Sequence, residues 1–83
     1  MKIMKIVLYG AKRCHKTQHY IGFFKEHHLD FVFLDVETNE EHANALRSLY
    51  TNGKLNFPTI TIDTKKLRNP SDKELLNWVH KLK

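Results

Sequence analysis

The stretch that decides the fold is residues 7–17, VLYGAKRCHKT. It belongs to a short apolar run over residues 3–9, which is rich in strand-forming side chains, ends at Gly10 and predicts a buried strand. After Cys14, apolar side chains recur at helical spacing, so we expect an amphipathic helix over residues 16–28. The sequence therefore predicts that Cys14 lies at a strand-to-helix junction.

The remaining segments repeat the same two periodicities. The nearly continuous apolar run over residues 31–36 is typical of a strand covered on both faces. Residues 59–63 alternate apolar and polar side chains, which predicts a half-buried strand, and residues 65–68 complete a hairpin with it. Two more helices are expected, one after Thr38 and one after Ser71, because each of these residues precedes a glutamate by three positions in a capping-box pattern.

The predicted element order is β-α-β-α-β-β-α. The first βαβ unit should be parallel and right-handed, and the last two strands should be antiparallel. A four-stranded mixed sheet flanked by helices buries the apolar side of every element, so the fold class is α/β. At 83 residues the chain should form one domain, residues 1–83, near the lower size limit for a hydrophobic core.

Composition and charge narrow the class of protein. Cys14 is the only cysteine, so a disulfide within the chain is excluded, and a lone cysteine without an export signal is typical of a cytoplasmic protein. No apolar run has the length of a membrane span. The net charge is +5 at pH 7, but there is no long basic run and no basic amphipathic helix. We therefore expect a monomer that binds neither nucleic acid nor a membrane.

Two short motifs carry a resemblance to a known family. Residues 7–10 followed by residues 14–17 form a strand and a loop that holds Cys14, and residues 57–59 are Phe-Pro-Thr before a strand. These motifs resemble the active-site loop and the cis-proline loop of glutaredoxins, and the resemblance covers nearly the whole chain. It implies a thioredoxin-like (glutaredoxin) fold, with Cys14 as the catalytic residue and a cis bond before Pro58.

Several positions depart from the pattern of that family. Thr17 stands where dithiol members carry their second cysteine, and His15 stands where the motif usually carries proline. The active-site motif Cys-His-Lys-Thr is therefore a single-cysteine variant. Arg68 and Asn69 occupy the place of a Gly-Gly pair that lets glutathione approach the backbone in many members, which leaves open whether glutathione or another small thiol is used.

The residues around Cys14 should favour its thiolate, the form that attacks disulfides. The N-terminal end of the helix stabilises negative charge on the sulfur, and the flanking positive charges lower the pKa of the thiol further. Their charge also argues against a buried, inert cysteine. The predicted thiolate-stabilising residues are Lys12, Arg13, His15, Lys16 and Thr17, the last through its hydroxyl.

The resemblance also implies where a thiol substrate binds. The backbone of Phe57 would pair with the substrate peptide, Pro58 would face the sulfur, and Ser71 and Asp72 would hold the γ-glutamyl carboxylate at a helix start. Each has a structural explanation too: an ordinary proline that opens an edge strand, an N-cap, and an acid that suits the helix dipole. Cys14, His15 and His19 are spaced like three metal ligands, but no metal motif surrounds them, so no metal and no bound cofactor is predicted.

The sequence thus predicts a thiol–disulfide oxidoreductase with a monothiol mechanism. Its substrates would be disulfide-bearing proteins, and glutathione or another low-molecular-weight thiol would be the co-substrate. Lys12, Arg13 and Lys16 would also attract anionic substrates. The alternative is a catalytically degenerate thioredoxin-fold module that binds an acidic protein partner through this basic face, with Cys14 as a redox sensor.

Overall fold

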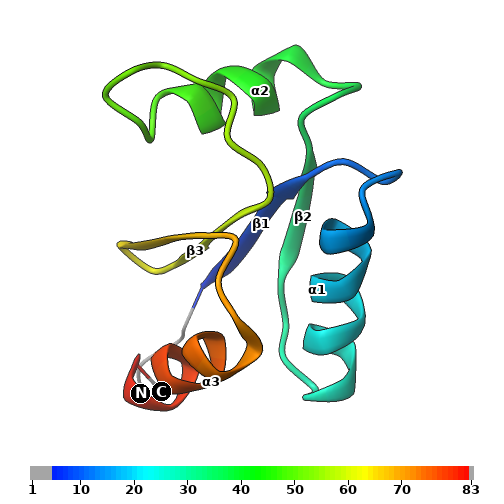
Figure 1. The fold of residues 1–83 in the computed structure, drawn as a ribbon, viewed down its shortest axis with the longest axis vertical. Helices are drawn as coiled ribbons and strands as arrows, with labels where there is room; N and C mark the ends of the chain where they lie inside the picture. Colours follow the sequence, from blue (N-terminus) through cyan, green and yellow to red (C-terminus); the bar gives the residue numbers. More distant parts are fainter. Residues whose placement is uncertain (1–4, 83) are drawn as a thin grey trace.

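The elements follow the order expected from the sequence (Figure 1). The structure is a computed structural model that describes residues 5–82, so the start of the strand predicted over residues 3–9 lies outside the described residues. The elements are β1 (Ile6–Gly10), α1 (His15–Glu26), β2 (Val32–Asp35), α2 (Glu40–Arg47), β3 (Thr59–Ile62), β4 (Lys65–Arg68) and α3 (Asp72–Leu82).

The four strands form one mixed sheet in the order β2-β1-β3-β4. β1 runs parallel to β2, with Val7 opposite Val32, and antiparallel to β3, with Leu8 opposite Ile60. β3 and β4 form the predicted antiparallel hairpin. The α/β class and the mixed four-stranded sheet flanked by helices are therefore confirmed.

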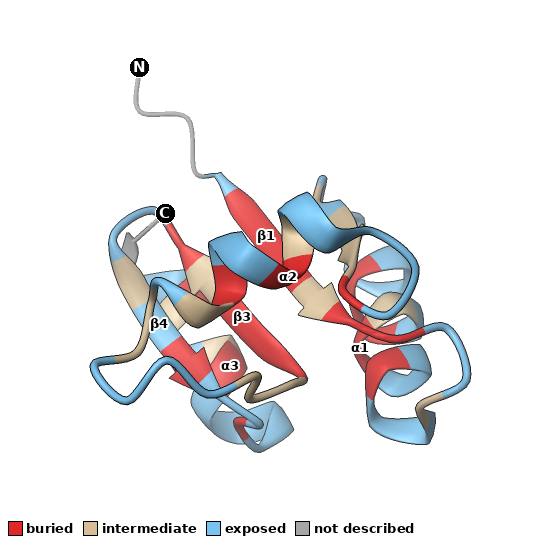
Figure 2. Ribbon diagram, turned by 90° about the horizontal axis from the view of Figure 1, so that it is seen from above, coloured by how far each residue is buried: buried red, intermediate tan, exposed pale blue. Residues whose placement is uncertain are grey.

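Side chains alternate between two apolar clusters on opposite faces of the sheet, as the period of a strand dictates. On one face, α1 and α3 bury the main cluster, in which Leu8, Phe24, Ile60 and Leu75 are all completely buried. On the other face, α2 packs a smaller cluster around Leu46. Figure 2 shows this buried interior as a red band along β1 and β3. Within residues 5–82, no helix is both long and apolar enough to cross a membrane.

The second strand is covered on its faces less completely than predicted. β2 lies at the edge of the sheet, and Val32 at its start is 47% exposed. The rest of the strand is only partly buried. Its apolar run reflects the packing of Phe33 in the main cluster and the contact of β2 with α2, while one edge of the strand is left without a neighbouring strand.

Helix ends explain the other departures from the predicted boundaries. α1 ends at Glu26 because His28 adopts a left-handed φ of 55°, and the N–H of Leu29 donates to the carbonyl of Phe24. This Schellman motif normally uses glycine. The capping box predicted at Thr38 is wrong: Asn39 is the N-cap of α2. At α3 the predicted cap is confirmed, because Ser71 Oγ accepts the N–H of Glu74 at 3.2 Å.

Candidate active site

Cys14 lies where the chain passes from β1 to α1, as predicted. It is the N-cap residue of α1, with extended φ and ψ of −82° and 123°, and its carbonyl accepts the N–H of Gln18 at 3.0 Å. Its own N–H donates to the carbonyl of Ala11, which closes the loop. The thiol is half-buried. This position aims the free N–H groups of the first turn of α1 toward the region of the sulfur.

Thr17 is completely buried behind Cys14. Its Oγ1 accepts the N–H of Ala11 at 3.3 Å, which ties the first turn of α1 to the loop. A threonine hydroxyl that accepts one hydrogen bond still has a proton to donate. The space for this side chain comes from Gly10, because a Cβ atom there would overlap Thr17.

The surroundings of Cys14 favour the thiolate. Burial raises the pKa of the thiol, but hydrogen bonds from the backbone and hydroxyl of Thr17 and from the backbone of Lys16 outweigh burial, and the charge of Lys16 adds to them. The pKa of Cys14 therefore lies below its ordinary value. The thiolate is the nucleophilic form of cysteine, so a partly exposed Cys14 with a lowered pKa is suited to attack a disulfide.

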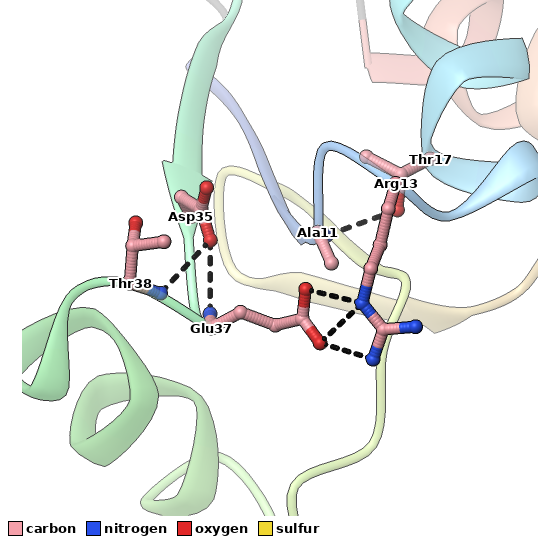
Figure 3. A network of polar contacts seen from close by, with 6 residues as sticks. All are labelled: Ala11, Arg13, Thr17, Asp35, Glu37 and Thr38. Atoms are coloured by element: carbon pink, nitrogen blue, oxygen red, sulfur yellow. Dashed lines mark hydrogen bonds and ion pairs between the residues drawn. The ribbon is translucent and has the colours of Figure 1, made fainter.

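Arg13, next to Cys14, forms an ion pair with Glu37 (Figure 3). Its Nε donates to both carboxylate oxygens of Glu37, each at 2.9 Å. Glu37 is held in turn because its N–H, like that of Thr38, donates to Oδ1 of Asp35 at the end of β2. The hydrogen bonds and the charge of Glu37 raise the pKa of Arg13, and the charge of Cys14 raises it further, so Arg13 interacts with both groups. Lys12 and His15 are exposed on either side of Cys14.

Cys14 opens on a groove of about 340 Å³ at the meeting point of three segments. Lys16 from α1 and the Phe57-Pro58 bond, which is cis as the resemblance implies, form part of its lining. The remaining lining residues come from the end of β4 and the loop that follows it. The full lining is Cys14, Lys16, Phe57, Pro58, Arg68 and Asn69.

Asn69 and Tyr20 fix the shape of this groove. Asn69 has a left-handed φ of 48°, and its N–H donates to the carbonyl of Pro58 at 3.1 Å. The hydroxyl of Tyr20, buried on α1, shares its single proton between Asn69 Oδ1 and the carbonyl of Pro70. Burial raises the pKa of Tyr20 to about 12. The sequence pattern assigned Tyr20 only to the apolar stripe of α1. A tyrosine among phenylalanines on a buried helix face indicates that its hydroxyl has a hydrogen-bond partner, and this signal was missed.

Ser71 and Asp72 are not among the residues that line this groove. Asp72 Oδ1 lies 2.7 Å from Nε2 of His19, so this carboxylate links the start of α3 to α1. Ser71 acts as the N-cap. Among residues 5–82, no three histidine, cysteine, aspartate or glutamate side chains are grouped as metal ligands.

Comparison with known proteins identifies the family to which the chain belongs. The family model described as Glutaredoxin matches residues 6–67. The chain belongs to the glutaredoxin family. The match contains the Cys14 loop and the Phe57-Pro58 bond, and membership supports a thiol oxidoreductase-type function. No curated protein matches the chain in a sequence comparison.

Solved structures show the same fold. The glutaredoxin grx-1 from Archaeoglobus fulgidus has a TM-score of 0.74 at 17% identity, over 89% of this chain and 84% of that one. The thioredoxin-like protein BC3987 has a TM-score of 0.73 at 22% identity, over 87% of this chain and 96% of that one. A point mutant of BC3987 has a TM-score of 0.75 at 22% identity, over 89% and 97% of the two chains. At these identities the likeness concerns the fold.

Proposed function

We propose that this glutaredoxin is a thiol–disulfide oxidoreductase that works through Cys14 alone, by a monothiol mechanism. The observation that carries the proposal is a half-buried thiol with a lowered pKa, opening on a groove beside the Phe57-Pro58 bond. The sequence holds no second cysteine, and Thr17 occupies the position where a resolving thiol would lie.

The reaction consists of two exchanges. In the first, the Cys14 thiolate attacks one sulfur of a mixed disulfide between a protein and a small thiol, forms a new disulfide with the small thiol, and releases the protein thiolate, which takes up a proton. In the second, the thiolate of another small thiol attacks that adduct and restores the Cys14 thiolate. The net reaction converts the mixed disulfide to the protein thiol and consumes one free small thiol, which leaves as a disulfide with the small-thiol half of the substrate. Glutathione or another low-molecular-weight thiol is the co-substrate, and no bound cofactor takes part.

The side chains around the groove have different roles in these two exchanges. Thr17 and Lys16 stabilise the thiolate, both as nucleophile and as leaving group in the second exchange. Phe57 and Pro58 form the wall along which the substrate backbone lies. Ser71 and Asp72, at the start of α3, would meet only a substrate that extends beyond the groove. The protein would act as a monomer in the cytoplasm on disulfide-bearing proteins.

A glutathione-coupled assay with hydroxyethyl disulfide tests the proposal. The wild-type chain should reduce the disulfide faster than the uncatalysed background, while Cys14→Ser and wild-type protein alkylated at Cys14 should both stay at background. Because the pKa of Cys14 is lowered, its alkylation at pH 5–6 should be faster than that of free cysteine. Equal rates for wild type and Cys14→Ser would contradict the proposal and favour a binding module that has lost turnover.

A further inference from the structure

Two carboxylates from the end of β2 lie beside the basic loop that precedes Cys14. Asp35, the last residue of β2, stands opposite Gly10 in the parallel β1–β2 register, and the N–H of the next residue donates to the carbonyl of Gly10 at 2.9 Å. Glu37 follows directly and forms its ion pair with Arg13 from there (Figure 3). The pairing of β1 with β2 therefore brings acidic side chains to a loop that is distant from them in sequence.

Glu37 is the fixed member of the pair with Arg13. Its side chain is 28% exposed, whereas that of Arg13 is 80% exposed. The N–H groups of Glu37 and Thr38 both donate to Oδ1 of Asp35, which holds the backbone that carries this carboxylate. Three N–H···O contacts, two from Nε and one from Nη2 of Arg13, then join the guanidinium to the carboxylate. Because both planar groups are engaged along one edge, the pair fixes direction as well as distance.

The same guanidinium also interacts with the nucleophile. Arg13 precedes Cys14 directly, and the negative charge of the thiolate adds to the larger effect of Glu37 in raising the pKa of Arg13. This attraction is mutual, so the cation favours the ionised form of Cys14. Arg13 thus has two anionic neighbours, and a guanidinium bound along one edge by Glu37 is less free to approach the sulfur.

The other titratable groups around Cys14 do not compete for Arg13 in this way. Burial raises the pKa of Asp35, but hydrogen bonds from Glu37 and Thr38 outweigh it, and the charge of Lys12 adds to them. Within residues 5–82, Lys16 makes no ion pair. Glu37 is therefore the acid that is bound to a cation adjacent to the thiol. The groups around Cys14 other than this pair are Lys12, His15, Lys16, Tyr20, Asp35 and Arg68.

We propose that Glu37 is a positioning residue that competes with the Cys14 thiolate for the guanidinium of Arg13. This inference rests on the proposed function and concerns the regulation of its nucleophile, and the two exchanges themselves are unchanged. Glu37 limits how far Arg13 stabilises the thiolate. The nucleophilicity of a thiolate falls as its pKa falls, so Glu37 favours a more reactive thiolate over a larger ionised fraction.

The pH profile of Cys14 alkylation by iodoacetamide tests the proposal, because its midpoint is the pKa of the thiol and does not depend on turnover. The variants are Glu37→Gln, Arg13→Gln and the double variant. Glu26→Gln is the matched control: it removes one negative charge at the end of α1, about 18 Å along the helix and beyond the screening length of about 10 Å at about 0.1 M salt. Reduction of hydroxyethyl disulfide with glutathione is measured separately on the same proteins.

Glu37→Gln should lower the midpoint, so that below it alkylation is about twofold faster than in wild type, because the guanidinium is free to approach the sulfur. Arg13→Gln should raise the midpoint, and Glu26→Gln should leave it unchanged. In the double variant the effect of Glu37→Gln should be smaller than in wild type, since the part that acts through Arg13 is lost.

An unchanged midpoint in Glu37→Gln overturns the proposal. An effect of Glu37→Gln that is equal with and without Arg13 also overturns it, because the carboxylate would then act on the sulfur directly. In both cases, reduction of hydroxyethyl disulfide by the wild-type chain still supports the oxidoreductase. A wild-type chain that does not reduce this disulfide overturns the proposed function, whatever the alkylation profiles show.

Discussion

The hydroxyl of Tyr20, on α1, donates a hydrogen bond of 3.2 Å to Oδ1 of Asn69, on the loop between β4 and α3. The same hydroxyl lies 2.5 Å from the carbonyl of Pro70. Asn69 also bonds to Pro58 through its N–H, so one buried side chain connects the helix that carries Cys14 to the opposite wall of the groove. Asparagine tolerates the left-handed backbone that this loop requires better than most residues other than glycine.

We predict that Tyr20→Phe destabilises the chain by about 1–2 kcal/mol, because the buried carbonyl of Pro70 loses its donor. Urea unfolding measures the loss. Tyr9→Phe is the matched control, since the Tyr9 hydroxyl makes no hydrogen bond within residues 5–82, and its unfolding midpoint should stay near that of wild type. Equal midpoints for the two variants would show that the Tyr20 bonds do not stabilise the loop.

Tyr20 also predicts a dependence of stability on alkaline pH. Its folded pKa of about 12 lies above the ordinary value of 10, so below pH 10 the phenol is neutral in both states. Between pH 10 and 12 only the unfolded chain loses this proton, which lowers the free energy of unfolding as the pH rises. Lysines titrate in the same range, so the measurement is the difference between wild type and Tyr20→Phe. A difference that stays constant from about pH 9 to 12 contradicts the raised pKa.

Thr17 should set the reactivity of Cys14. Thr17→Val removes a hydroxyl that lowers the pKa of the thiol, so alkylation at about pH 6 should slow several-fold. Thr17→Ser keeps the hydroxyl and should remain close to wild type. Near pH 10, where the thiol is ionised in all three proteins, their rates should converge. A loss that persists in that alkaline range would indicate a distorted loop instead of a changed pKa.

Two glycines should respond to alanine in opposite directions. At Gly10 a new Cβ overlaps the buried side chain of Thr17, so Gly10→Ala should destabilise by about 1–3 kcal/mol. At Gly22, exposed on α1, a new Cβ meets nothing within 4 Å, and Gly22→Ala should stabilise by about 0.5–1 kcal/mol. Thermal or urea unfolding gives both values. The same sign for both variants would contradict the close approach of Gly10 to Thr17.

Much of the fold follows from local pattern. The element order and the β3–β4 hairpin depend on periodicities that each segment carries by itself, and Ser71 caps its helix through its own side chain. The edge position of β2 could not be predicted, because an apolar run does not tell which strands lie beside it. The end of α1 could not be predicted either, since His28 adopts the φ expected of glycine.

The site was predictable where it is continuous in sequence. Cys14, Lys16 and Thr17 follow from the motif, and the structure brings Phe57 and Pro58 to them as the resemblance implied. Contacts between residues that are far apart in the sequence could not be predicted. Arg68 lines the groove because β4 ends opposite Thr59, beside the cis-proline bond, and its sequence distance from Cys14 does not indicate this.

A lone thiol also changes what the oxidised protein is. A chain with two neighbouring thiols closes on itself and reaches the same state whatever oxidised it. Cys14 has no such partner in this sequence, so each oxidised molecule keeps a covalent fragment of its last reaction partner. The mixture of adducts on Cys14 in a population of molecules then reflects which thiols are present around the protein. These adducts are removed only by exchange with a free thiol, so their lifetime depends on its concentration.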